Sequence, residues 1–514
     1  MALSNQVDEK PHDPDHVESV LNVVQIDNIQ VLGLRSDDAE FYLNFPSEKK
    51  KQILWKVDIR LVPMLAVLYL ISHLDRANIG NAKIEGLVED LGLDGLQWNI
   101  VLSIFFIPYV LLEVPSNMLL KNFSRPSVYL GILITCWGII MTLTGMVQNF
   151  AGLMVTRILL GIFEAGFFPG AVYLCTFWYM PKDLSTRIAF FYCASALSGA
   201  FSGLLAAGIA KMDGVGGQEG WRWIFLLEGI VTVMLGVMCF FWLIDSPARS
   251  TKWLEPEEIR YLELQHFIKE GGNFKEEKKT KVVWKDLFAV FTNWRMYLLA
   301  YILLCQSACS YGTKFTLPTI TKSMGFTNTN AQLMTVPPYV AGAISALFFS
   351  TLSDRFYWRF PFVAAPLCLV TIGYAVVISF HGALKENVGP AFFAVILTCM
   401  GIYPIHPATT SWTANNLTPS SHRAIGLAFN ICIGNIGGII GSYMYLDRES
   451  PKYYTGFGLS TAFGASGLIV ACLLELSYVW ANKQKEKKMS EAETYTDDEL
   501  LSMGHKSPLF KYTL

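Results

Sequence analysis

Asp75 and Arg76 are adjacent ionisable residues in a stretch that begins as the apolar run Leu61–Ser72 and is expected to continue as a helix. At the middle of a membrane, an ionisable side chain costs about 2.5–3.5 kcal/mol on insertion scales, so it usually faces protein or a water-filled path. His73 and Asn78 lie close by in the sequence. We interpret these residues as one wall of a site for a substrate and a proton. Neighbouring helix residues point about 100° apart, which argues against the alternative of a permanent Asp75–Arg76 pair.

Arg157 and Glu164 form a second ionisable set inside an apolar stretch. Their spacing puts them on one helix face, two turns or about 10 Å apart along the axis. Burial favours the protonated form of a carboxylate, whereas a nearby guanidinium favours the ionised form, so a change in their separation can load or release a proton. We therefore predict a proton-coupling role for Glu164 and Arg157. In the alternative, Arg157 is only a structural ion-pair partner of Glu164.

The second half of the chain carries fewer charges within its apolar runs. We expect Tyr311 and Lys314 to contribute to substrate binding, with Lys314 in the outer part of its span. There its charge either draws anions inward or extends to the membrane interface. Pro404 and Pro407 are expected to break their span and free backbone carbonyls that line a cavity. His406, between them, is our candidate in this half for a role in substrate choice, and a packed core histidine is the alternative.

Composition indicates that these residues belong to a membrane protein. The chain has 514 residues, 52% of them hydrophobic, and a net charge of −2, with a mean hydropathy of +0.37, well beyond a soluble domain. The near balance of charge gives no indication of nucleic-acid binding. The order of the apolar runs indicates an internal duplication. Six runs long enough to cross a bilayer are followed by a polar linker and then by six more such runs. The runs are roughly 61–82, 98–120, 127–147, 151–179, 187–210, 221–243, 294–321, 330–351, 360–380, 390–412, 424–444 and 457–481.

We therefore predict an all-α membrane protein with twelve transmembrane helices in two pseudo-symmetric six-helix bundles. Lys and Arg residues concentrate in the loops on one side and in the linker, which predicts that both termini and the linker are cytoplasmic.

The ten cysteines fall inside apolar runs and are interpreted as small core residues, so neither a metal nor a cofactor is predicted. The predicted parts are a disordered N-terminus (1–50), an N-terminal bundle (51–244), a linker (245–292), a C-terminal bundle (293–482) and a tail (483–514).

Two stretches are rich in small residues. They are Ala194–Gly203 and Gly434–Gly441. Small residues let helix backbones approach closely in a membrane. We expect tight helix packing at both stretches, and a gating role is the alternative that goes beyond packing.

Two motifs resemble the major facilitator superfamily. The first is Arg157-x-x-x-Gly161 followed by a Gly and Pro pair, within the predicted fourth span. The second is Leu352-Ser-Asp354-Arg355 with Arg359, which is similar to the cytoplasmic gate motif of that superfamily. The resemblance implies that Asp354, Arg355 and Arg359 form part of an inner gate. The matching loop of the first half departs from the pattern, because Lys121 stands where the gate carboxylate is expected.

The full set of motifs narrows the resemblance to the fungal anion:cation symporters, which include allantoate, pantothenate and nicotinate permeases. It rests on Leu74–Asn81, Ile107–Asn117 and the Glu-containing fourth span. The resemblance implies proton-coupled uptake of a small organic anion across the plasma membrane. In this branch the positions matching Asp75 and Glu164 carry protons, the position matching Arg76 binds the substrate carboxylate, and that matching Tyr109 lines the pocket. Arginine suits this role because its rigid fork of donors grips a carboxylate bidentately.

The predicted function is therefore that of a proton-coupled symporter, a monomer in the lipid bilayer, with nicotinate or a similar vitamin-type monocarboxylate as the first candidate substrate. Pantothenate, biotin, allantoate, sugar acids and short peptides stay open, as does export of a carboxylate metabolite. A membrane-embedded enzyme would need a nucleophile–base pair or metal ligands, and no such motif is found in the sequence. A nutrient sensor that keeps the fold without transporting is a further alternative.

Overall fold

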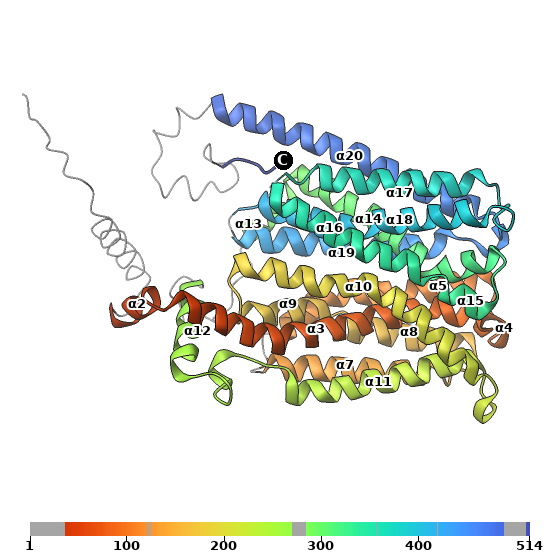
Figure 1. Ribbon diagram of the computed structural model, residues 1–514, viewed down its shortest axis with the longest axis horizontal. Coiled ribbons are helices and arrows are strands. Elements are labelled where there is room, and N and C mark those ends of the chain that lie inside the picture. Colours follow the sequence, from red (N-terminus) through yellow and green to blue (C-terminus); the bar gives the residue numbers. More distant parts are fainter. Residues whose placement is uncertain are drawn as a thin grey trace, which may run out of the picture. The chain divides into compact units, whose positions relative to one another are not determined.

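The structure is a computed structural model, and it consists of helices, with no strand among the residues it describes (Figure 1). The described residues are 36–120, 123, 125–269, 284–356, 358–418, 420–487 and 510–514. Residues 1–35 of the predicted disordered N-terminus, 270–283 of the linker and 488–509 of the tail lie outside these ranges. So do Lys121 and the side chain of Asp354. The predicted boundaries of the two bundles and the linker stay a prediction.

The chain divides into two compact units. The first combines residues 1–62, 173–186 and 244–281, and the second combines 63–172, 187–243 and 282–514. All residues that line the candidate site described below belong to the second unit, so the site is described within that unit alone.

The first unit is held by aromatic and ionic contacts between segments far apart in the sequence. Helix α2 (Ser36–Leu43) and the start of α3 (Ser47–Ile84) belong to it together with α12 (Pro256–Lys269). The Phe45 ring stacks on that of Tyr261, with 4.4 Å between centroids, and Lys56 Nζ lies 2.7 Å from Glu258 Oε1. The prediction of disorder for residues 1–50 is therefore wrong for 36–43 and 47–50, because the aromatic residues of this segment have a partner surface.

Eleven described helical segments are long and apolar enough to cross a membrane. Helix α14 (Trp294–Ser323), the predicted seventh span, is not one of the eleven, although its 30 residues would extend about 45 Å. It carries polar residues such as Gln306 and Lys314 in its interior. The eleven segments are α3, α5–α6 (Gly95–Leu120), α7 (Pro126–Thr144), α8–α9 (Phe150–Thr176), the Ala194–Met212 part that includes the end of α10 (Pro181–Ile209), α11 (Gly220–Trp242), α15–α16 (Asn328–Ser353), α17 (Pro361–Ser379), α18 (Val388–Asn415), the Ile425–Met444 part of α19 (Ser420–Met444) and α20 (Tyr454–Lys487).

Within the second unit, helices pack closely where one of them presents a glycine. A Cβ on Gly437 of α19 would lie 2.6 Å from the carbonyl oxygen of Leu304 on α14, closer than real Cβ contacts allow. A Cβ on Gly203 of α10 would lie 2.6 Å from the carbonyl oxygen of Gln332 on α15 (Asn328–Leu333). Both glycines lie in the two small-residue stretches, so the expectation of close packing there is confirmed. Helix α7 packs along α11 in the same way, and the two lie side by side in Figure 1.

Helix α18 runs unbroken from Val388 to Asn415, with Pro404 and Pro407 inside it. The prediction that these prolines break the span is therefore wrong. Proline lacks the N–H that would bond the carbonyl four residues earlier, and for Pro404 that carbonyl belongs to Met400. Ser345 Oγ donates a hydrogen bond to Met400 O at 2.6 Å, so the freed carbonyl has a partner and the helix continues.

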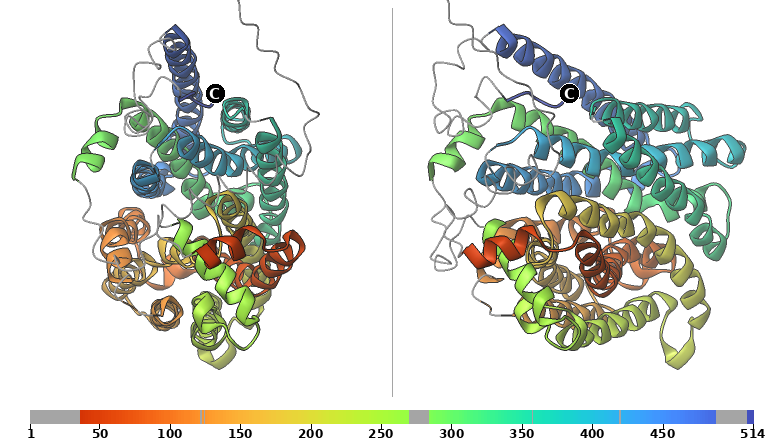
Figure 2. Two further views of the ribbon diagram at one scale, coloured as in Figure 1. Left: turned by 90° about the vertical axis from the view of Figure 1, so that its left-hand side faces the viewer. Right: turned by 60° about the vertical axis from the view of Figure 1, so that its left-hand side comes forward.

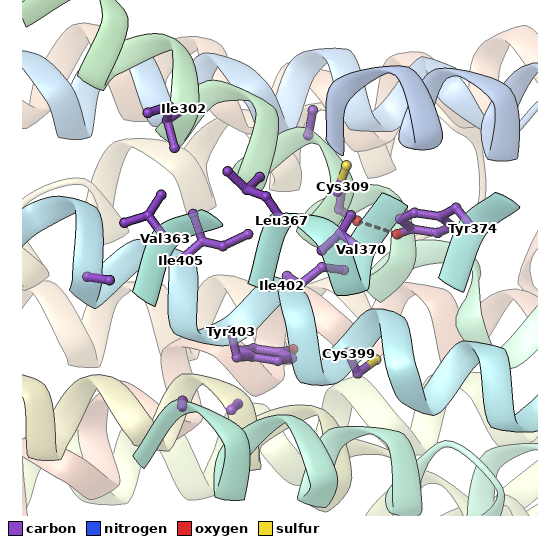
Figure 3. Packing of buried hydrophobic residues seen from close by; sticks show 14 of the residues in the cluster. Ile302, Cys309, Val363, Leu367, Val370, Tyr374, Cys399, Ile402, Tyr403 and Ile405 are labelled. Carbon is purple, nitrogen blue, oxygen red and sulfur yellow. Dashed lines mark hydrogen bonds between the residues drawn. The ribbon is translucent and has the colours of Figure 1, made fainter. Parts of the chain in front are cut away.

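An apolar core joins helices of the second half of the chain (Figure 3). Leu367 and Val370 of α17 lie among side chains of α14 and α18, including Ile302 and Ile402. The Tyr374 hydroxyl donates to the backbone oxygen of Cys309 at 3.4 Å, the interaction drawn in Figure 3. This core fixes α14 and α18, which both contribute residues to the site.

Residues 510–514 pack against helix ends of the second unit. The side-chain amide of Asn482 donates to Tyr512 O and accepts from Tyr512 N, both at 2.9 Å. Asn416 makes the same two bonds with Thr513, at 3.0 and 2.7 Å. The Lys487 end of α20 itself extends away from the neighbouring helices of this unit (Figure 2). The segment 510–514 therefore connects the ends of α18 and α20.

Candidate functional site

A polar cavity of about 50 Å³ lies between helices of both halves of the chain. This volume admits water, which needs roughly 10–15 Å³. Its lining contains one arginine (Arg76), one lysine (Lys314) and two histidines, and none of the lining residues is Asp or Glu. The cavity is lined by Tyr69, Ser72, His73, Arg76, Tyr109, Phe167, Phe168, Ser195, Gln306, Ser307, Ser310, Tyr311, Lys314, Tyr403, His406, Ile431 and Asn435. All five residues predicted to bind substrate are among them.

Arg76 is held by a carboxylate and a hydroxyl from two other helices. Its Nε and Nη2 both contact Glu164 Oε1 of α8 (Phe150–Glu164) at 2.7 Å. Its Nη1 donates to the Tyr311 hydroxyl of α14 at 2.8 Å. Ser72 Oγ, one turn earlier on α3, donates to the same Glu164 oxygen at 2.5 Å. Glu164 Oε2 is buried and has no hydrogen-bond partner among the described residues.

Lys314 is the second cationic group of the cavity. Its Nζ lies 3.2 Å from His73 Nδ1 and 3.5 Å from Ser195 Oγ, and it forms no ion pair with a described carboxylate. Only 3% of the residue is exposed, so it does not extend to a membrane interface as one alternative proposed. It lines the same cavity as Arg76 instead of lying apart from it. Lys314 is therefore available to an anionic ligand.

Aromatic and imidazole groups complete the walls. The Arg76 guanidinium carbon lies 4.7 Å from the ring centroid of Tyr109, a cation–π distance. The Tyr69 ring meets the His73 ring edge to face, with 4.6 Å between centroids. His406 lines the cavity as predicted and makes a contact with Thr410 Oγ1 of its own helix at 3.5 Å. The ligand space thus has flat apolar surfaces beside its cations.

Asp75 does not line the cavity. Its Oδ2 accepts from Trp137 Nε1 of α7 at 3.0 Å and from Thr232 Oγ1 of α11 at 3.5 Å. Arg76, the next residue, points to Glu164 instead. The sequence-based argument against an Asp75–Arg76 pair is therefore confirmed, but the expectation that both face one chamber is wrong, because successive helix residues point in different directions.

Arg157 also differs from its expected arrangement. The ion-pair partner of Glu164 is Arg76, and no hydrogen bond or ion pair of Arg157 is found among the described residues. The Arg157 guanidinium lies 6.0 Å from the ring centroid of Phe105. The alternative in which Arg157 is the structural partner of Glu164 is therefore wrong. The seven-residue spacing placed both residues on α8, yet α3 supplies a closer cation.

The predicted gate residues lie at the end of α16 (Val336–Phe356) and in the loop after it. Arg355 is exposed, whereas Arg359 is buried, and its Nη1 donates to Ser353 Oγ at 2.7 Å. The backbone N–H of Arg359 donates to Leu514 O at 2.5 Å. Because the side chain of Asp354 lies outside the described residues, the role of this set as a gate stays a prediction.

The end of α3 at Ile84 is tied directly to elements of the second half. Lys83 Nζ lies 2.5 Å from Asp447 Oδ1. Gln332 Nε2 donates to Glu85 Oε1 at 3.0 Å. These contacts join the halves on one side of the cavity, at the same end of the unit as the close α10–α15 packing at Gly203.

Sequence reasoning missed several residues of this region. Ser72 and Ser195 contact the charged groups, and their small hydroxyls inside apolar runs carry a weak signal. Glu228 carries a strong signal, since it is the only acidic residue between Gly220 and Trp242. The same criterion that singled out Asp75, an ionisable residue in an apolar span, would have found it.

A sequence model of the Major Facilitator Superfamily matches residues 65–442. The chain therefore belongs to this superfamily, and it is a membrane transporter by family rather than an enzyme. This confirms the predicted family and the predicted all-α membrane fold.

Related chains are fungal transporters. The sequence is 35% identical over 485 residues to the MFS-type transporter cnsO of Penicillium expansum, covering 91% of this chain and 92% of the relative. It is 32% identical over 468 residues to the high-affinity nicotinic acid transporter of Saccharomyces cerevisiae, covering 90% and 85%. A solved bacterial homolog of the human lysosomal transporter Spinster, inward-facing and occupied, has a TM-score of 0.61 at 16% identity and covers 81% of this chain and 95% of that chain. At this identity the likeness shows the fold alone.

Proposed function

We propose that the protein is a proton-coupled symporter that imports a small organic carboxylate. The observation that carries the proposal is the charge of the cavity. Arg76 and the protonated form of Lys314 supply two positive charges, and Glu164, behind Arg76, supplies one negative charge at hydrogen-bond distance. The set carries a net charge of +1 with Glu164 ionised and +2 with Glu164 protonated, so it attracts an anionic carboxylate in both states. An anion beside Lys314 also favours the protonated form of the amine.

Protonation of Glu164 would link the proton to the anion. In the structure, one Glu164 oxygen accepts three bonds, two of them from Arg76, and the other oxygen has no partner among the described residues. A proton on the second oxygen removes the negative charge of Glu164, breaks the ion pair and weakens the hold on Arg76. The guanidinium fork is then free to bind a substrate carboxylate bidentately. Proton and anion therefore bind together, as symport requires.

The cavity must widen before a substrate can enter it. A volume of about 50 Å³ holds water but is too small for a pyridine carboxylate. Contacts such as Lys83–Asp447 close one side of the cavity. We propose that they open and close in alternation with the gate around Arg359, so that the two halves rock about the fixed site. With both termini cytoplasmic, the Lys83 end faces outward, and the proposed location is the plasma membrane.

Nicotinate, or a similar vitamin-type monocarboxylate, is the proposed substrate. The relative named as a high-affinity nicotinic acid transporter supports it. The aromatic walls at Tyr69 and Tyr109 suit a flat ring whose carboxylate is held between Arg76 and Lys314. A monomer is proposed, because the site is complete within one chain.

The test is uptake of labelled nicotinate by a yeast strain that lacks its own nicotinate permease and expresses this protein. Uptake is expected to appear with the protein, to rise as the external pH is lowered and to collapse when a proton uncoupler is added. Equal uptake with and without the uncoupler would contradict proton coupling. Stronger inhibition of this uptake by another carboxylate than by unlabelled nicotinate would reassign the substrate and keep the transporter class.

A further inference from the structure

Helix α3 has a second polar face that does not meet the cavity. Asp75, Asn78 and Asn81 follow one another at intervals of three residues and therefore lie along one side of the helix. Each is at most 2% exposed. Ser202 Oγ of α10 donates to Asn78 Oδ1 at 2.8 Å and accepts from Asn81 Nδ2 at 2.7 Å. This face is thus a continuous row of buried polar groups directed at α7, α10 and α11.

Glu228 of α11 adds a second carboxyl group to this row, about one helical turn from Asp75. Asn78 Nδ2 donates a hydrogen bond to Glu228 Oε2. Thr232, one turn further along α11, donates to Asp75 Oδ2 at 3.5 Å and to the Glu228 backbone oxygen at 2.9 Å. The facing pairs are therefore Asp75 with Thr232 and Asn78 with Glu228. The two carboxyl groups are offset by about one helical turn, roughly 5 Å.

Each carboxyl group of this pair has an oxygen without a partner. Asp75 Oδ1 and Glu228 Oε1 are buried and accept no hydrogen bond from a described residue, and the two residues are 1% and 5% exposed. No described Lys or Arg is within ion-pair distance of either group. The charged groups that act on the pair electrostatically are Glu164 and Arg157 of α8, both through Asp75. Two neighbouring carboxylates without a paired cation cannot both remain ionised in a dry interior.

We propose that Asp75 and Glu228 form one proton-binding unit, separate from the substrate cavity, that holds a proton of the transport cycle. The inference rests on the proposed symport function and adds Glu228 to it. Binding of one proton converts one carboxylate of the pair to a carboxyl group and lowers the negative charge of the unit by one. Because Asp75 precedes Arg76 on α3, this change acts on the Arg76–Glu164 ion pair without any contact with the substrate.

The pair can be tested without transport. Infrared difference spectra of the purified protein between acidic and alkaline buffer report protonated carboxyl groups through their C=O band. A C=O band that is lost in Glu228→Gln is assigned to the carboxyl group of Glu228. In Asp75→Asn this band is expected to titrate at lower pH, because the neighbouring negative charge is gone. The proposal of one proton-binding unit would be overturned if the Glu228 band is absent, or if it titrates at the same pH in Asp75→Asn as in the wild type.

Uptake of labelled nicotinate into proteoliposomes, measured at neutral and at acidic external pH, tests the role of the pair in coupling. In Glu228→Gln the gain in labelled nicotinate uptake on acidifying the outside is expected to fall by at least about tenfold, because an amide side chain cannot take up the proton that the carboxyl group holds. The double variant with Asp75→Asn is expected to lose no more than the larger single loss, as for residues that act as a unit.

Glu475→Gln is the matched control. Like Glu228, Glu475 is a buried glutamate with one oxygen that has no described partner. Like Asp75, it accepts a hydrogen bond from a tryptophan, Trp358 Nε1, at 3.0 Å. It lies on α20, away from the cavity lining, so this variant should keep the wild-type pH profile. A wild-type pH profile in Glu228→Gln would overturn the inference. No nicotinate uptake by the wild type would contradict the proposed function instead, and the infrared result would still decide the pair.

Discussion

Replacing Arg76 by alanine is expected to abolish carboxylate uptake, and adding Glu164→Gln to the same chain is expected to restore stability but not uptake. In the structure, Arg76 makes the only ion pair of Glu164 found among the described residues. The single variant therefore leaves a buried carboxylate without its partner, which costs about 3–5 kcal/mol. Glutamine removes that negative charge while it can still accept from Ser72. The anion, however, has lost its guanidinium in both variants.

Thermal unfolding in detergent and uptake by intact cells separate these effects. The midpoint of unfolding should fall in Arg76→Ala and return toward that of the wild type in the double variant. Arg76→Lys keeps a charge but cannot reproduce the contacts that the guanidinium makes with Glu164 and Tyr311, so we expect it to recover only part of the uptake. A double variant that transports like the wild type would show that Arg76 serves the fold and not the substrate.

Replacing Lys314 by methionine is expected to raise the KM for carboxylate uptake by about 10- to 100-fold, the loss of one charge-assisted hydrogen bond. Methionine approximates the length and apolar stem of lysine, so the packing of α14 is largely preserved. The amine is buried next to His73 and Ser195 and forms no ion pair in the described part of the chain. Its removal therefore leaves no opposite charge unpaired, and the effect should fall on the anion rather than on stability.

Lys322→Met on the same helix is the matched control. Lys322 is exposed near the end of α14 and does not line the cavity. Concentration series of uptake should give a raised KM for the Lys314 variant and a wild-type KM for the Lys322 variant. An unchanged KM in Lys314→Met would place the anion elsewhere.

The positions of most helices could be predicted from the sequence because apolar length is a local property. The cavity residues Arg76, Tyr109, Tyr311, Lys314 and His406 could also be named. The first two followed from motifs, and the others from polar residues inside apolar spans. Their partners could not be named, because the contact of Arg76 with Glu164 joins residues from different helices. Spacing along α8 favoured Arg157 as that partner, although a residue from α3 lies closer.

Side-chain direction and contacts between residues far apart in the sequence account for the other differences between the predictions and the structure. Asp75 and Arg76 are neighbours in sequence, but one contacts Trp137 and the other lines the cavity. The prolines of α18 do not end the helix, because Ser345 from another helix satisfies a freed carbonyl. The N-terminal helix α2 forms because α12 offers aromatic contacts more than 200 residues later.

The most direct test of the proposed anion site is a binding assay on the purified protein with pairs of ligands that differ mainly in charge. Nicotinate and other monocarboxylates are each compared with their uncharged amides through the thermal stabilisation they give. We expect at least one acid to stabilise the wild type, its amide to have little effect, and Lys314→Met to lose the difference while Lys322→Met keeps it. Amides that stabilise the protein as well as their acids, in the wild type and in Lys314→Met alike, would contradict an anion site at Arg76 and Lys314.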